Sequence, residues 1–258
     1  MADKVSWEKE EHIGLVSFAQ VMIERAFIDD FHRVMDEIES DDQIRVVIIK
    51  GAPGKIFFAG YDIGLMTAAE GVESAYLNGK TVEVQQLINR IEYCNKPVIA
   101  AVDGYAAGGG CEMLLACDLV YASERALIGT PEVKIGLIPA AGGTIRLPRM
   151  VGKHRAMEMI LTARMYTAEQ ANQMGIVNQI FAHEELQEKT MKIANAIARN
   201  APIAVRAAKA SVVKSMTCLD KQYELITAEE NLKCLTSADI KEGANAFMEN
   251  RKPDFKGE

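Results

Sequence analysis

Short β-branched runs alternate with stretches of helical spacing in the first half of the chain. The apolar runs at 13–18, 45–50, 97–102 and 118–122 predict buried strands. Between the first two runs, apolar residues recur at helical spacing over 23–38, and a short helix is expected at 110–116 between the last two. This alternation predicts an α/β fold with a largely parallel sheet covered by helices.

The pattern becomes mostly helical after Gly143. Candidate helices span 143–150, 154–161, 168–174, 183–200 and 202–215, and a final helical stretch over 220–250 is broken near Ser237. The plain sequence contains no fixed-period repeat and no low-complexity linker. We therefore expect an α/β core followed by a helical carboxy-terminal part, without a sharp boundary between them.

Composition and charge narrow the possible partners. With 49% hydrophobic and 25% charged residues, the 258-residue chain resembles an ordinary soluble protein. Its net charge of -7 leaves no basic excess for nucleic acid, and no apolar run approaches the roughly 20 residues of a membrane helix. The charged amino terminus lacks the apolar core of a secretory signal. We therefore expect a small-molecule partner, and neither a nucleic acid nor a membrane.

The cysteines indicate the cellular compartment. They are odd in number and form no CxxC pair, which is typical of reduced thiols in a cytoplasmic protein. Most are expected to fill the core. The five are Cys94, Cys111, Cys117, Cys218 and Cys234.

A strand that runs into three glycines and then a helix is the strongest local signal for chemistry. The stretch 96–112 reads KPVIAAVDGYAAGGGCE. Glycines at such a junction let a ligand approach bare backbone, and the N–H groups of a helix start can hold an oxyanion. Glu112 lies in the first turn and could simply complement the helix dipole. Its apolar neighbours at 113–116 instead predict that the carboxylate is semi-buried. Because burial of a charged group costs free energy, a semi-buried carboxylate indicates a functional role.

A second carboxylate, Glu132, follows Pro131 in a glycine-rich connection before a helix start at Gly142 and Gly143. By itself it could equally be a solvated turn residue. Two carboxylates in one apolar pocket would have their pKa values pushed apart, which provides one acid and one base at neutral pH. Addition or removal of water requires such a pair.

A third segment, 51–63, begins GAPGK and superficially suggests a phosphate-binding P-loop. The spacing of its glycines and the isoleucine after the lysine do not fit that motif, so we expect a loop with a main-chain N–H near Tyr61 that points into a site. The GxSxG, HExxH and GxGxxG patterns are absent. The four histidines are scattered along the sequence, so neither a histidine base nor a metal site is expected.

These segments resemble the enoyl-CoA hydratase branch of the crotonase superfamily. The resemblance rests on FAGYDI at 58–63, KPVIAAV at 96–102, GYAAGGGCE at 104–112, PEV at 131–133, IPAAGGT at 138–144 and AFMENRKPDF at 246–255. It covers nearly the whole chain. It implies a spiral of ββα units at 1–195, which carries the active site, and a helical trimerisation region at 196–258. Members of the family assemble as trimers that often pair into hexamers.

The resemblance also implies an activity, enoyl-CoA hydration by a hydro-lyase of fatty acid or other acyl-CoA metabolism. Main-chain N–H groups of Tyr61 and Gly109 would form an oxyanion hole for the thioester carbonyl. Glu112 would activate the water and Glu132 would deliver a proton to the α-carbon. No metal and no separate cofactor are expected, since coenzyme A is part of the substrate. The predicted substrate-binding residues are Ala59, Tyr61, Asp62, Ile63, Gly108, Gly109, Pro131, Pro139 and Gly142.

Four departures from the family pattern leave the acyl group open. The first is SFAQVM at 17–22, where many members have an Asn-Pro-like stretch before the first helix. Tyr61 stands where alanine is more common, Gly64 where a lysine often helps hold coenzyme A, and Ile145 in place of a common glutamine. A branched or alicyclic acyl group is therefore one alternative to a straight short chain, and Lys55 is a candidate for a phosphate contact.

Other activities on the same scaffold remain open alternatives. They are a Δ3,Δ2-enoyl-CoA isomerase, a thioester hydrolase or a dehalogenase. A non-catalytic acyl-CoA-binding or RNA-binding protein is a more distant alternative. Retention of both glutamates favours the hydratase.

Overall fold

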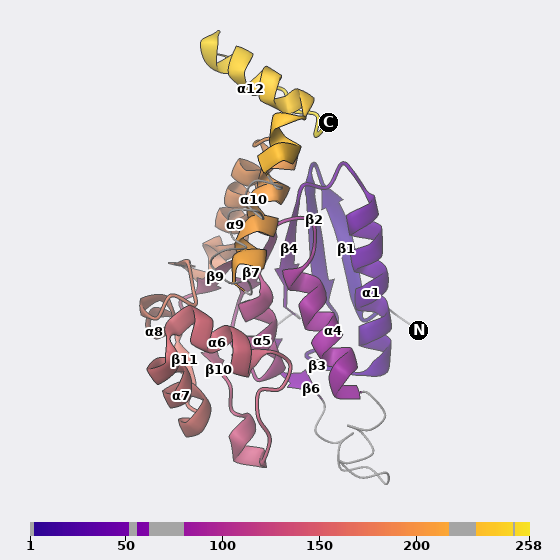
Figure 1. The fold of residues 1–258 in the computed structure, drawn as a ribbon. Helices are drawn as coiled ribbons and strands as arrows, with labels where there is room; N and C mark the ends of the chain where they lie inside the picture. The colour runs from indigo at the N-terminus through magenta and orange to yellow at the C-terminus, as the bar shows by residue number, and fades with distance from the viewer. Residues whose placement is uncertain (1–2, 52–55, 62–79, 217–230, 250) are drawn as a thin grey trace.

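The larger of the sheets has six strands in the order β1-β2-β4-β7-β9-β12 (Figure 1). The computed structural model describes residues 3–51, 56–61, 80–216, 231–249 and 251–258. All neighbouring strands in this sheet are parallel except β1 and β2. The predicted parallel sheet is confirmed. Its strands are β1 (Val5–Glu10), β2 (Ile13–Phe18), β4 (Val46–Lys50), β7 (Val98–Val102), β9 (Leu119–Ser123) and β12 (Gln179–Phe181).

Helices cover both faces of this sheet, which explains why its central strands β4 and β7 read as continuous apolar runs. Successive side chains of a strand point to opposite faces. Val47 and Ile49 of β4 thus join the core with α1 (Arg25–Ser40), α4 (Lys80–Glu92) and α5 (Gly109–Ala116). Val46 and Ile48 pack on the other face with α9 (Leu186–Ala198).

A second sheet, with the order β11-β10-β8-β5, turns this arrangement into a spiral. Each of three long strands is followed by a short strand of the second sheet: β4 by β5, β7 by β8, and β9 by β10. A helix then returns the chain to the first sheet, so the predicted ββα spiral is confirmed. The short strands are β5 (Ile56–Phe58), β8 (Tyr105–Ala107), β10 (Leu127–Gly129) and β11 (Tyr166–Thr167), while β3 (Met22–Ile23) pairs with β6 (Gly60–Tyr61).

The helices after Gly143 match the predicted ones to within a few residues. They are α6 (Gly143–Val151), α7 (Lys153–Thr162), α8 (Ala168–Gln173), α9, α10 (Pro202–Ser215) and α12 (Ala238–Met248), with short 3-10 helices η1 (Glu132–Ile135) and η2 (His183–Glu185). The predicted break at Ser237 is confirmed by a turn before α12. None of the helices in the described ranges is long and apolar enough to cross a membrane.

Two details near the amino terminus differ from the expectation. The helix predicted at 23–38 begins at Arg25 because Ile23 belongs to strand β3. The charged start of the chain forms β1, an antiparallel edge strand with largely exposed side chains. An edge strand with polar side chains lacks the apolar run on which the other strands were predicted.

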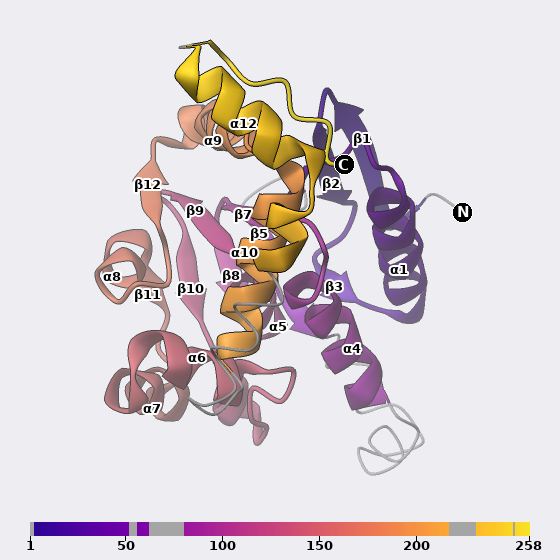
Figure 2. The ribbon, with the colours of Figure 1, turned by 45° about the horizontal axis from the view of Figure 1, so that its top comes forward.

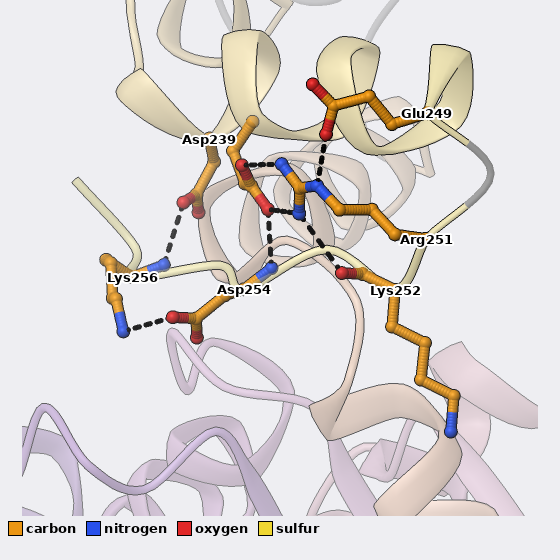
Figure 3. A network of polar contacts seen from close by, with 7 residues as sticks. Asp239, Glu249, Arg251, Lys252, Asp254 and Lys256 are labelled. Carbon is orange, nitrogen blue, oxygen red and sulfur yellow. Dashed lines mark hydrogen bonds and ion pairs between the residues drawn. The ribbon is translucent and has the colours of Figure 1, made fainter.

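The carboxy-terminal segment, 251–258, folds back along α12 (Figures 2 and 3). The carboxylate of Asp239 accepts hydrogen bonds from the N–H groups of Lys256 and Gly257 at 2.8 and 2.9 Å. Arg251 pairs with Glu242 and Glu249 at 2.6 Å each. These contacts hold the segment against its own helix.

Arg45, at the start of β4, connects this segment to the core. Its guanidinium donates to the carbonyl oxygen of Phe255 at 2.9 Å and to that of Ala198 at 3.0 Å. The predicted division between 1–195 and 196–258 falls inside α9, and the trimerisation role of the second part stays a prediction.

Candidate active site

Three glycines bring the main chain of α5 unusually close to its neighbours. A Cβ on Gly110 would overlap the carbonyl oxygen of Phe58, and a Cβ on Gly60 would lie 2.7 Å from the nitrogen of Gly109. Gly108, which precedes the helix, has a φ of 55°. Side chains at these positions would separate the helix start from β5 and β6, so the glycines are needed for the approach.

The close packing of β5 and β6 against the start of α5 brings main-chain N–H groups together at the entrance of this helix. The N–H of Gly109 lies in the first turn, where a helix offers no acceptor of its own. Glu112 is the first residue whose N–H bonds back into the turn, to the oxygen of Gly108 at 2.9 Å. Tyr61 follows Gly60 on β6. The two residues predicted to form an oxyanion hole thus lie on adjoining stretches of backbone.

Glu112 is buried more deeply than its sequence context suggested, with 4% of the residue exposed. Its Oε1 accepts a hydrogen bond of 2.9 Å from the N–H of Gly143. Burial raises the pKa of Glu112 to about 7, and the nearby Glu132 adds to that rise, whereas the main-chain N–H groups of Gly143 and Ala141 and the charge of Arg146 lower it. This carboxyl can therefore gain or lose a proton near neutral pH.

Glu132 is the first residue of η1 and is not a solvated turn residue. Both of its carboxylate oxygens are buried, and no other described residue donates a hydrogen bond to them. A Cβ on Gly108 would lie 3.3 Å from its Oε1, which places this carboxylate at the entrance of α5. Burial also raises the pKa of Glu132. A buried carboxylate without partners is expensive, and such a group is typical of a site that binds a polar ligand.

The thiol of Cys111 feels the charges of both carboxyl groups. It is fully buried, and its pKa is raised by burial and by the charges of Glu132 and Glu112. A thiol in this state is a poor nucleophile. The arrangement therefore provides two carboxyl groups and main-chain donors, which together can move protons beside a stabilised oxyanion.

The turn at 139–143 holds the carboxylate of Glu112 through the N–H of Gly143. Pro139 is buried, and a Cβ on Gly143 would lie 2.6 Å from the Cβ of Pro139 and 3.1 Å from Oε1 of Glu112. Gly142 caps α6 with a φ of 119°. Two side chains bind carbonyl oxygens of this turn: Gln85 binds that of Ala140 at 2.7 Å, and Arg146 that of Ala141 at 3.2 Å.

Neither Gln85 nor Arg146 was singled out from the sequence. The available signal was an arginine near the start of the predicted helix that begins at the second glycine of the pair 142–143. From the sequence alone, a charged residue at this place is expected to lie on the surface. Only the tertiary structure shows that Arg146 is buried.

Of the remaining predicted substrate-binding residues, the structure describes two and leaves two outside the described ranges. Ala59 is exposed between β5 and β6, and Pro131 caps η1. Asp62, Ile63, Gly64 and Lys55 lie outside the described residues. Within the described ranges, no group of three or more His, Cys, Asp or Glu side chains could hold a metal ion.

Comparisons with known proteins place the chain among acyl-CoA enzymes. A family model described as Enoyl-CoA hydratase/isomerase matches residues 12–258. Short-chain-enoyl-CoA hydratase of Clostridium acetobutylicum is 36% identical over 254 residues, which cover 97% of this chain and 96% of that protein. 2,3-Dehydroadipyl-CoA hydratase of Escherichia coli is 40% identical over 230 residues, 87% of each chain.

The solved structures agree with the sequences. A crystal structure of enoyl-CoA hydratase from Bacillus anthracis superposes with a TM-score of 0.93 at 33% identity, covering 99% of this chain and 100% of that one. The similarity therefore extends over the core and the carboxy-terminal helices together.

Proposed function

Since this chain belongs to the enoyl-CoA hydratase/isomerase family, as its motifs predict, we propose that it adds water across the α,β-double bond of an enoyl-CoA thioester. The observation that carries the proposal is the pair of buried carboxyl groups, Glu112 and Glu132, at the entrance of α5. Two such groups can share one water, which hydration requires. Coenzyme A enters as part of the substrate.

The thioester oxygen accepts hydrogen bonds from the N–H groups of Gly109 and Tyr61 in this proposal. As water adds at the β-carbon, negative charge develops on that oxygen. Preorganised donors of this kind are each worth about 10²–10³ in rate. The close contact of Gly60 with the nitrogen of Gly109 supports the proposed oxyanion hole.

Glu112 removes a proton from the water, and Glu132 delivers one to the α-carbon. The N–H of Gly143 favours an ionised Glu112, while Glu132 has no comparable donor and is favoured as the protonated partner. The deeper burial of Glu112 works against this assignment. The assignment concerns which of the two carboxyl groups holds a proton when substrate is bound.

The test is to incubate the protein with linear, branched and cyclic enoyl-CoAs and to weigh the thioester products by mass spectrometry. Gain of one water that is lost in Glu112→Gln and Glu132→Gln, and retained in the exposed control Glu124→Gln, is the expected result. Release of free coenzyme A would indicate a hydrolase instead. Unchanged mass with a moved double bond would indicate an isomerase.

The roles of the two glutamates can be separated with saturated acyl-CoAs in D₂O. If Glu132 serves the α-carbon, Glu132→Gln loses exchange of the α-proton, whereas Glu112→Gln retains part of it. If Glu112→Gln lost the exchange and Glu132→Gln retained part of it, Glu112 would be the residue that serves the α-carbon and Glu132 the one that activates water.

We also propose a homotrimer or a dimer of trimers. Large apolar side chains stay exposed on the carboxy-terminal helices of the single chain, and a second copy could cover them. They include Val212, Met216, Leu232, Leu235 and Ile240. Sedimentation velocity distinguishes the assemblies.

The proposed compartment is the cytoplasm. Cys94, Cys111 and Cys117 are buried and form no disulfide, which is compatible with a reducing environment. Localisation of the tagged full chain in its host tests this proposal.

A further inference from the structure

Arg146 is a buried cation beside the proposed active site that the reaction as described does not use. Only 7% of the residue is exposed. Its Nη2 donates to Oε2 of Glu92 and to Oδ1 of Asn89, both at 2.6 Å, and its Nε reaches the same Glu92 oxygen at 3.1 Å. Both partners lie on α4, so the guanidinium links α6 to that helix.

The same guanidinium also holds the turn that carries the Glu112 contact. Nη1 of Arg146 donates to the carbonyl oxygen of Ala141 at 3.2 Å. A Cβ on Gly142 would overlap this Nη1, so the side chain lies directly against the turn. Gln85 of α4 binds the preceding carbonyl, that of Ala140. Helix α4 thus holds the turn both directly and through Arg146.

We propose that Arg146 is a positioning residue for hydration, which fixes the turn at 139–143 so that its main-chain N–H groups bind the carboxylate of Glu112. The chain of contacts is continuous: Glu92 orients Arg146, Arg146 holds Ala141, and Gly143 donates to Glu112 at 2.9 Å. The proposal rests on the hydratase function, because it assigns Arg146 a part in the same reaction.

The charge of Arg146 acts in the same direction as these hydrogen bonds. Charged and titratable groups face Glu112 from several elements: Glu132 of η1 raises its pKa, Arg146 of α6 lowers it, and the buried Cys111 adjoins it on α5. On α4, Glu92 partly offsets the charge of Arg146. Removal of the guanidinium therefore shifts Glu112 toward its protonated form.

The test compares Arg146→Gln and Arg146→Lys with wild type over about pH 5.5 to 9.5. For Arg146→Gln, the acid limb of kcat/KM moves to higher pH, so activity near pH 6 falls roughly tenfold or more and recovers toward pH 9. Lysine keeps the charge but not the planar fork, so it restores part of the acid-side activity. Arg125→Gln is the matched control, since it removes an exposed ion pair with Asp103.

A second variant addresses folding, because Arg146→Gln leaves Glu92 partly buried without its cation. Arg146→Gln combined with Glu92→Gln removes both charges, and a movement of the acid limb in the same direction, but smaller than in Arg146→Gln alone, is expected in it. Equal losses at every pH, with no movement of the limb, would overturn the proposal and leave Arg146 a structural residue only.

A readout independent of turnover separates this proposal from the hydratase function. In ¹³C-glutamate-labelled protein, the carboxyl signal that disappears in Glu112→Gln can be titrated directly. The expected result is a higher pKa of Glu112 in Arg146→Gln than in wild type. If wild type showed no hydratase activity, this titration would still support or refute the positioning of Glu112, while the function failed separately.

Discussion

Replacement of Glu112 by glutamine should strongly lower activity and at the same time stabilise the fold above neutral pH. Glutamine keeps the shape of the side chain and an oxygen that can accept the 2.9 Å hydrogen bond from Gly143. It removes a charge that is 4% exposed. Loss of a base beside the reacting water should lower kcat by about 10²–10⁴.

The size of the stabilisation follows from the pKa of Glu112. Burial raises this pKa from 4.5 to about 7, and each pH unit of difference between folded and unfolded states is worth about 1.4 kcal/mol. A raised carboxyl pKa means that the folded state holds its proton more tightly than the unfolded state. Its contribution is fully present below pH 4.5 and is lost as pH rises through about 7. The ionised carboxylate therefore costs about 3 kcal/mol above neutrality.

Urea unfolding at one fixed protein concentration measures this difference. The free energy of unfolding of Glu112→Gln minus that of wild type should grow between about pH 4.5 and 7 and approach ~3 kcal/mol at pH 8. The exposed Glu124→Gln serves as control and should show no such trend. A variant less stable than wild type at pH 8, or a difference independent of pH, would refute the claim that the buried charge of Glu112 strains the fold.

Three further predictions concern other parts of the structure. Gly108→Ala should lower kcat by about 100-fold with little change in secondary structure, because its Cβ would lie 3.3 Å from Oε1 of Glu132 on a φ of 55°; steady-state kinetics and circular dichroism test this. Lys96→Met should destabilise the fold by about 1–3 kcal/mol in urea unfolding, since the buried ammonium of Lys96 binds two carbonyl oxygens at the end of α1. Burial raises the pKa of Cys94 to about 12 and also holds the pKa of Cys111 above its usual range, so both thiols should react with a disulfide reagent only after unfolding, as peptide mass spectrometry would show.

Much of the fold could be predicted because its long strands and helices carry local signals. The strands β4 and β7 are buried on both faces, so each reads as a β-branched or alanine-rich run. The helices after Gly143 have one buried face and therefore show helical periodicity. The spiral itself was predicted from the family motifs. Its short strands, such as β8 and β10, have three residues each, too few for a periodic pattern.

The sequence by itself determined where the chemistry had to be sought. The three glycines before Glu112 and the proline before Glu132 are local features, because they concern backbone approach and chain reversal. The burial of Glu132 is different, since it depends on how η1 packs against the start of α5. Only the tertiary structure decided that its carboxylate is enclosed.

The environment of Glu112 likewise depends on contacts distant in sequence. Gly143 lies 31 residues from Glu112, and Glu92 lies 54 residues from Arg146. Local patterns indicate which residues are apolar or charged, but the pKa of a carboxyl depends on the donors, charges and solvent around it in space. The motifs therefore predicted the pair of glutamates, whereas the burial that raises their pKa values and the position of Arg146 beside Glu112 depend on tertiary packing.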